Sequence, residues 1–251
     1  MFVCWCQQSK GYFINKLYNM IRTDDVTNRI KNNEQIVFVK YGDGETFCML
    51  GYRGSNCDND PYTPILGEGL RNSLKFYIEH KDFFVGRWHD NKLINPIIEN
   101  LDIGEPTWAP YHLVMNADDI YDFPYMYDFL KSIQDTKRKK IIVSNNNNIY
   151  MKSLFHADTF IEVPPNNWFV NFEQYFEAVK HEIVDDCILF TSAGQGSKVL
   201  IAELLKLFPK LSCIDIGSSF DFLCQRRITR DRGVYDYNRE LIYYNDLLPR
   251  S

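Results

Sequence analysis

The sequence predicts an α/β protein with a Rossmann-like, three-layer architecture, in which helices cover both faces of a mostly parallel sheet. Short apolar runs alternate along the chain with longer segments whose apolar residues recur at helical spacing. Continuous apolar runs are typical of strands buried on both faces, and their alternation with helices is typical of crossover-connected parallel strands. The chain has 251 residues, of which 45% are hydrophobic and 24% charged. We therefore expect one globular domain over residues 1–251.

The apolar runs predict seven strands, at residues 36–39, 83–85, 112–115, 141–143, 159–163, 187–190 and 213–216. Helical spacing predicts helices around residues 70–78, 172–183 and 199–208, and Pro209 ends the last of these. Residues 1–25 are expected to form an N-terminal arm or helix that docks on the domain. Four consecutive basic residues at 137–140 precede a strand, and we interpret them as a solvated helix end.

Composition excludes several classes of function. The net charge of −5 disfavours nucleic acid as a partner, because proteins that bind duplexes carry a basic face. No apolar stretch approaches the ~20 residues that cross a bilayer, so we expect no transmembrane segment. The seven cysteines contain no CxxC pair, which disfavours a zinc site. A reducing compartment fits best, and we expect a cytoplasmic protein, in the host cytoplasm if the source is viral.

The turn after the first predicted strand carries two acids. Asp43 and Glu45 flank Gly44, and Gly42 precedes them. Two carboxylates close in sequence can share a hard divalent cation, and glycine permits close approach of a ligand to the backbone. The alternative is a tight turn followed by a helix whose first turn carries a glutamate favoured by the helix dipole.

A second candidate is the small-residue turn between the strand at 187–190 and the next helix. Ser192, Gly194, Gly196 and Ser197 leave backbone N–H groups near a helix N-terminus, where an anion such as phosphate binds. The spacing is not that of a Walker loop. The alternative is an ordinary glycine-rich turn in which Ser197 caps the helix.

Other polar groups follow predicted strands. Asn145 and Asn167 offer amides near strand ends, the latter beside Trp168. Asp215 and Gly217 end the last predicted strand in a pattern that is also found in enzymes that use S-adenosylmethionine. His89 and His112 each lie near a predicted strand end, where either could act as a catalytic base or have a structural role.

In chain order, these segments resemble the GT-D-type glycosyltransferases, bacterial and viral surface-glycan enzymes with a Rossmann-like fold and an Asp-x-Glu metal motif. Asp43 and Glu45 fall on the two acids of that motif. Further matches are the Asn-Asn-Trp element at 166–168, the strand, turn and helix at 192–205, the Ile-Asp-Ile-Gly strand at 214–217, and Thr229-Arg230. Two departures, Asn-Asn-Trp for Asn-Ala-Phe and Ala-Gly-Gln-Gly for a Gly-Pro turn, bear on base and sugar specificity.

The resemblance implies a hexosyl- or pentosyltransferase that moves a sugar from a nucleoside-diphosphate sugar, with UDP the first candidate, to a glycan acceptor. Mn²⁺ or Mg²⁺ would bind Asp43 and Glu45, and Arg230 would contact the diphosphate. Catalytic roles would fall to Asp43, Glu45, Asp221 and His112. For a base that takes the proton of the acceptor hydroxyl, the candidates are Asp221, Asp215 and His112, in that order. Donor contacts fall to Gly42, Gly44, Asn145, Asn167, Ser192, Gly194, Gly196, Ser197 and Arg230. The alternatives are an S-adenosylmethionine-dependent methyltransferase that acts on a sugar and a non-catalytic nucleotide- or glycan-binding module.

Overall fold

A parallel sheet of seven strands forms the middle of the molecule. The computed structural model describes residues 21–56, 59–87, 94–101, 104–114, 123–225 and 245–247. Within these ranges the strand order is β3-β2-β1-β7-β6-β4-β5, and every pairing is parallel. The strands are β1 (Val37–Tyr41), β2 (Phe84–Arg87), β3 (Thr107–Pro110), β4 (Lys139–Ser144), β5 (Thr159–Glu162), β6 (Cys187–Ser192) and β7 (Ser212–Asp215).

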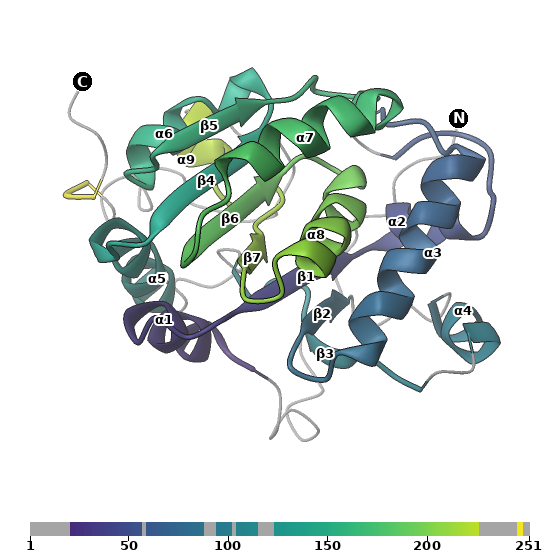
Figure 1. Cartoon of the computed structure of the whole chain (residues 1–251), viewed down its shortest axis with the longest axis horizontal. Coiled ribbons are helices and arrows are strands. Elements are labelled where there is room, and N and C mark those ends of the chain that lie inside the picture. The colour runs from purple at the N-terminus through teal and green to yellow at the C-terminus, as the bar shows by residue number, and fades with distance from the viewer. Residues whose placement is uncertain are drawn as a thin grey trace.

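Helices cover both faces of the sheet, so the three-layer α/β prediction is confirmed (Figure 1). One face packs against α2 (Asp43–Met49), α3 (Pro64–Glu79), α4 (Ile94–Leu101), α7 (Phe172–Glu182) and α8 (Gly196–Leu207). The other packs against α1 (Thr23–Lys31), α5 (Phe123–Asp135), α6 (Tyr150–Leu154) and α9 (Asp221–Gln225). Two short 3₁₀ helices, η3 (Asn146–Asn148) and η4 (Trp168–Asn171), follow β4 and β5.

The alternation of side chains along β1 fills both cores. Val37, Val39 and Tyr41 belong to the core under α3 and α8, while Ile36 and Phe38 belong to the core under α1 and α5. Successive residues of a strand point to opposite faces, so a strand buried on both sides must be apolar at nearly every position. This is why the continuous apolar runs predicted a parallel sheet.

The order of the strands places a topological switch point between β1 and β7, and we call the carboxyl end of the sheet at this point the crevice. From β1 the chain builds β2 and β3 on one side, and it later returns through β6 to β7 on the other side. After β1 it enters α2 on one face, and after β7 it enters α9 on the opposite face. Ligands of open α/β sheets bind where the connections diverge in this way, at the carboxyl ends of the strands.

Two local predictions are wrong. Residues 111–114 form turns rather than a strand, and Met115 lies outside the described residues. The strand is β3, which ends at Pro110. Because β3 is an edge strand, Pro110 does not disrupt a ladder on both sides.

The basic residues at 137–140 are the second correction. Arg138 and Lys140 are buried at the start of β4 rather than solvated at a helix end. The Arg138 guanidinium donates to the carbonyl of Cys187 at 3.2 Å and to Ser212 Oγ at 2.8 Å, and it pairs with Asp186. A buried cation persists where such partners satisfy its donors.

The four cysteines that the structure describes are free and buried, namely Cys48, Cys187, Cys213 and Cys224. Burial raises the pKa of Cys48 to about 11 and raises the pKa of the other three thiols as well. Because the thiolate is the reactive form, we expect Ellman's reagent at pH 8 to spare them. In a variant with Cys4, Cys6 and Cys57 changed to Ser, thiols should react only after unfolding in guanidinium. Rapid reaction of the folded variant would contradict the packing described.

Within the described ranges, the structure contains no helix that is long and apolar enough to span a membrane. Residues 1–20, most of the predicted N-terminal arm, lie outside the described residues, and α1 begins at Thr23.

Candidate active site

The two acids of the first turn lie on different sides of the backbone. Glu45 is buried, and its Oε2 accepts the backbone N–H of Gly42 at 2.9 Å, which caps the start of α2. Asp43 is exposed, and its Oδ1 accepts the N–H of Gly44 at 2.9 Å. A Cβ at Gly42 would lie 3.2 Å from the hydroxyl of Tyr111 and 3.3 Å from Glu45 Oε2, so a larger residue there would require one of these side chains to shift slightly.

Lys198 joins Glu45 to the opposite side of the crevice. Its Nζ lies 2.9 Å from Glu45 Oε1, 2.9 Å from Asp215 Oδ2 and 3.1 Å from the carbonyl of Gly194. An ammonium group has three donors, and these three acceptors match them. Burial by itself lowers the pKa of Lys198, but the carboxylates of Asp215 and Glu45 outweigh it, so the pKa is raised and the amine stays charged.

Asp215 and Lys40 complete a neutral group of four buried charges. Asp215 Oδ2 also accepts the backbone N–H of Lys40 at 3.3 Å, and its Oδ1 accepts the N–H of Gly217 at 3.1 Å. Lys40 Nζ donates to the carbonyl of Ile216 at 2.8 Å. Two cations and two anions therefore balance at the carboxyl ends of β1 and β7. We call Lys40, Glu45, Lys198 and Asp215 the charge cluster.

Only one of the two carboxylates in this turn is placed to bind a divalent cation. Each carboxylate oxygen of Glu45 is already engaged, one by an ammonium group and the other by a backbone N–H. Asp43 is exposed just beyond the carboxyl end of β1, and Mg²⁺ commonly uses one or two carboxylates together with phosphate oxygens and water. The described residues include no cluster of three or more His, Cys, Asp or Glu side chains arranged for a metal. Asp43 therefore fits a cation that a substrate helps to hold, and a metal-ligand role for Glu45 stays a prediction.

The turn before α8 is crowded by Asp60, unlike a simple phosphate-binding loop. Gly194 has φ +62°, and Asp60 Oδ2 lies only 2.5 Å from the point where a Cβ on Gly194 would stand. Within the described chain, Ser197 Oγ and both amide atoms of Gln195 are buried without a hydrogen-bond partner. A carboxylate beside the turn opposes an anion there, because like charges repel. Phosphate binding by Ser192, Gly194, Gly196 and Ser197 stays a prediction.

The contact of Gly194 with Asp60 can be tested by comparing two glycines of positive φ. Gly51 has φ +75° and nothing within 4 Å of an added Cβ. We expect Gly51→Ala to lower the free energy of unfolding by ~1–2 kcal/mol through backbone strain alone. Gly194→Ala should lower the free energy of unfolding by ~1–3 kcal/mol more than Gly51→Ala does, because the added methyl group displaces Asp60. Equal losses in urea denaturation would show that Asp60 does not press on this turn.

A second polar group surrounds Asp221, on the far side of β7. Asn148 Nδ2 donates to Asp221 Oδ1 at 3.1 Å and to Ser144 Oγ at 3.2 Å, and lies 3.4 Å from Ser192 Oγ. Gln225 Nε2 donates in turn to Asn148 Oδ1 at 2.8 Å. The structure thus brings together Asp221 and Ser192, which were predicted separately, through Asn148, which was not.

The remaining predicted residues are dispersed. Asn145 caps η3, its side chain accepting the N–H of Asn147 at 3.0 Å. His112 packs edge-on against Tyr111 near the end of β3. Arg230 lies outside the described residues.

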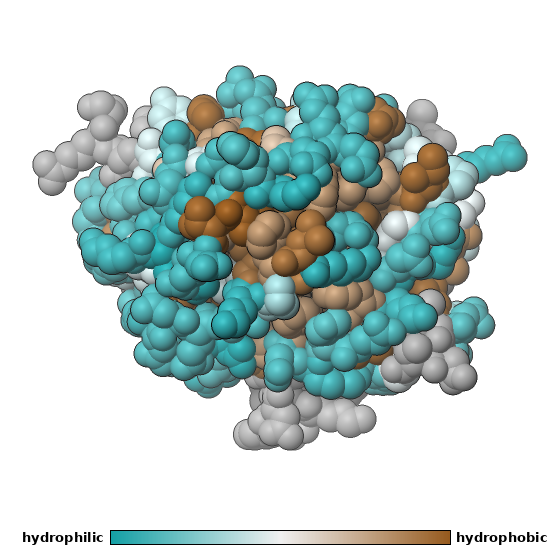
Figure 2. Space-filling model, viewed as in Figure 1, coloured by the Kyte–Doolittle hydropathy of each residue, from teal (hydrophilic) through white to brown (hydrophobic). Residues whose placement is uncertain are grey.

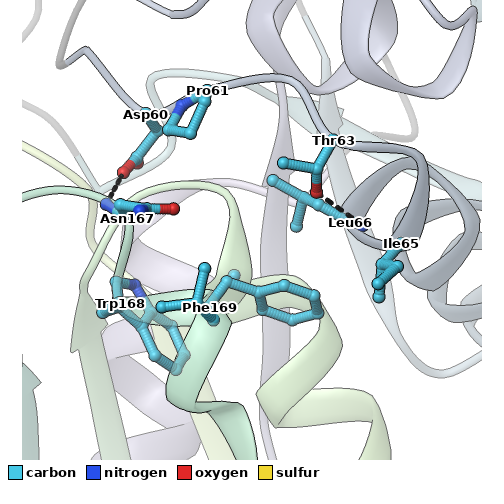
Figure 3. A pocket seen from close by; sticks show the side chains of 10 residues that line it. Asp60, Pro61, Thr63, Ile65, Leu66, Asn167, Trp168 and Phe169 are labelled. Carbon is cyan, nitrogen blue, oxygen red and sulfur yellow. Dashed lines mark hydrogen bonds between the residues drawn. The ribbon is translucent and has the colours of Figure 1, made fainter.

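Asn167 lines a pocket with Asp60, between the start of α3 and η4 (Figure 3). Asn167 has left-handed backbone geometry, with φ 55°, and its N–H donates to Asp60 Oδ1 at 2.7 Å. Gly196 leaves room for Trp168, since a Cβ there would lie 2.6 Å from the indole ring. Trp168 Nε1 donates to the carbonyl of Ala193 at 2.6 Å, which fixes the pocket to the turn before α8.

Sequence reasoning missed Lys198, Lys40, Asp60, Asn148 and Gln195. A weak signal existed for the first two. Lys198 is a lone charge at the start of an apolar helix, and Lys40 is the one charge in the apolar run of β1. A lysine in a run that is otherwise buried implies a carboxylate partner, although its identity depends on the fold.

Comparisons with known proteins find structures of similar fold but no relatives by sequence. No family model matches the chain, and no curated protein matches it. A selenomethionine-substituted structure of domain of unknown function 1792 is 16% identical with a TM-score of 0.60, covering 92% of this chain and 90% of that one. A structure described as a new glycosyltransferase (DUF1792) from Streptococcus sanguinis is 17% identical with a TM-score of 0.60, covering 81% and 84%.

A third structure, described as the highly conserved domain of unknown function 1792 with a distinct glycosyltransferase fold, is 15% identical with a TM-score of 0.60. It covers 92% of this chain and 90% of that one. At such identities the likeness is one of fold. The chain therefore shares the fold of the domain of unknown function 1792, which is the fold that the residues at 43–45, 192–205 and 214–217 had indicated.

Proposed function

We propose that this protein is a glycosyltransferase that moves a sugar from a nucleoside-diphosphate sugar to a glycan acceptor. The observation that carries the proposal is the exposed carboxylate of Asp43, at the carboxyl end of β1 in a fold shared with structures described as glycosyltransferases. This end of β1 borders the crevice beside β7, where open α/β sheets bind ligands. A UDP-sugar is the first donor to test.

Asp43 and Glu45 take different parts in this proposal. Asp43 would hold Mn²⁺ or Mg²⁺ together with the donor. When bound, the cation supplies positive charge that offsets the charge building on the leaving diphosphate. Glu45 caps α2 and orients Lys198, so it is a positioning residue that keeps the turn of Asp43 in place.

Asp221 is the best candidate for the base that takes the proton of an acceptor hydroxyl. It is partly buried at the start of α9, and Asn148 orients its carboxylate. Asp215 is unsuited to this role, because Lys198 and two backbone N–H groups occupy its oxygens. The same occupation disfavours the methyltransferase alternative, which would use Asp215 to bind its cofactor. His112 remains the second candidate for the base.

The proposal is tested by the release of nucleoside diphosphate from a panel of UDP-, GDP-, ADP- and dTDP-sugars, with Mn²⁺, Mg²⁺ or EDTA. Water can stand in for the unknown acceptor, so slow hydrolysis suffices. We expect release from at least one donor with a divalent cation and none with EDTA. If no donor is turned over while UDP binds, the molecule is a binding module. Calorimetric binding of S-adenosylmethionine instead of UDP would support a methyltransferase.

A further inference from the structure

The pocket beside the turn before α8 combines one polar edge with apolar walls. Its volume is about 190 Å³. The polar edge consists of Asp60, Asn167 and Thr63, and in Figure 3 the side chain of Asn167 points into the space. The walls are Pro61, Ile65, Leu66, Trp168, Phe169, Val170 and Gly196. The volume lies below the roughly 300–1,000 Å³ of pockets for drug-sized ligands, so the pocket suits a single ring.

The chemistry of these walls selects a neutral, hydroxylated ring. None of the ten described lining residues is Lys or Arg, and the one charged side chain is the carboxylate of Asp60. A phosphate group would be repelled by this acid, whereas a carboxylate and an amide match the hydroxyl groups of a sugar. The apolar face of a sugar ring can lie on an aromatic side chain such as Phe169.

The place of the pocket connects it to the candidate active site. Asp60 lies against Gly194, whose carbonyl accepts a hydrogen bond from Lys198 of the charge cluster. Asn56, which pairs with Asp60, lies 3.2 Å from the point where a Cβ on Gly44 would stand. Asn56 therefore lies between the pocket and the turn that carries Asp43.

We propose that this pocket is the subsite for the acceptor sugar, with Asp60 and Asn167 binding its hydroxyl groups and Phe169 contacting its apolar face. The proposal rests on the proposed function, because only a glycosyltransferase needs an acceptor sugar beside its donor. The rim is open to a ligand, since Ile65 is 77% exposed and Val170 66% exposed. In Figure 2 apolar atoms gather near the centre of this face, over α8 and the C-terminal half of α7, and only scattered apolar residues lie near the first turns of α3 and α7.

The test uses methyl glycosides as probes, followed by saturation-transfer NMR on the whole protein. A panel of methyl pyranosides of glucose, galactose, mannose, rhamnose and N-acetylglucosamine is screened first. Val170→Arg then places a long charged side chain at the rim, and Asp60→Asn removes the carboxylate. Val184→Arg is the matched control, because Val184 is 50% exposed and lies between α7 and β6, outside the lining residues.

We expect at least one methyl pyranoside to bind. Val170→Arg and Asp60→Asn should each weaken its binding at least fivefold, and Val184→Arg should leave it unchanged. Unchanged binding in Val170→Arg, or no binding by any probe, would overturn the proposal. Loss of UDP binding rather than pyranoside binding in Val170→Arg would also overturn it, since the pocket would then serve the donor. Failure of the proposed function would appear differently, as no turnover of any nucleotide-sugar by the unmodified protein.

Discussion

Lys198→Met is expected to lower the free energy of unfolding by ~3–5 kcal/mol, the loss typical when one partner of a buried ion pair is removed. The substitution keeps the length and apolar stem of the side chain but removes its charge. Glu45 and Asp215 would then face each other in the interior with no cation at 2.9 Å from either. An unpaired buried carboxylate is costly because it loses water without gaining a partner.

Lys206→Met is the matched control on the same helix. Lys206 pairs with Glu203, but its side chain is 45% exposed, and an exposed pair of this kind contributes ~0–1 kcal/mol. Urea denaturation of both variants gives the comparison. Adding Glu45→Gln to Lys198→Met should restore part of the loss, because one of the two stranded negative charges disappears. If Lys198→Met cost no more than Lys206→Met, the charge cluster would not stabilise the crevice.

Asp43→Asn is expected to reduce turnover of a nucleotide-sugar by roughly 10²–10³-fold, the loss typical when one group that stabilises developing charge is removed. The amide keeps the size of the side chain but no longer attracts a divalent cation. Because Asp43 is exposed and its carboxylate accepts the N–H of the adjacent Gly44, the free energy of unfolding should change by less than ~0.5 kcal/mol.

Asp185→Asn provides the control for charge alone. Asp185 is exposed in the turn before β6, at the opposite end of that strand from the crevice. The Asp185→Asn change should alter neither turnover nor the free energy of unfolding. If the Asp43→Asn variant kept more than half of the activity, Asp43 would not belong to the proposed active site. The same conclusion would follow if its loss of turnover came with a marked loss in the free energy of unfolding.

Most of the sheet could be predicted because its signal is local. Val37 to Tyr41 and Cys187 to Phe190 are apolar at almost every position, and both faces of the sheet require this. The error at β3 arose because Thr107–Pro110 is a short edge strand with a proline, which carries little of that signal. Burial of Arg138 was not predictable, since its partners Cys187 and Ser212 lie far along the chain.

The site was predictable in its position but not in its geometry. The turn of Asp43 and Glu45 follows β1 as expected. The sequence also indicated both alternatives for Glu45, namely a ligand of a divalent cation or a glutamate in the first turn of a helix. That Glu45 turns inward depends on Lys198, which sequence reasoning did not single out. The pocket depends on Asp60 meeting Asn167, a contact 107 residues apart in sequence. Such contacts are set by tertiary packing, which no local pattern encodes.

The most direct test of the account is the position of manganese in crystals grown with UDP and MnCl₂, located by anomalous scattering at the manganese edge. The account predicts one strong peak beside the carboxylate of Asp43 that also touches the diphosphate, with Lys198 still holding Glu45 and Asp215. Bound UDP whose manganese lies away from Asp43, or UDP without any ion at this turn, would contradict it.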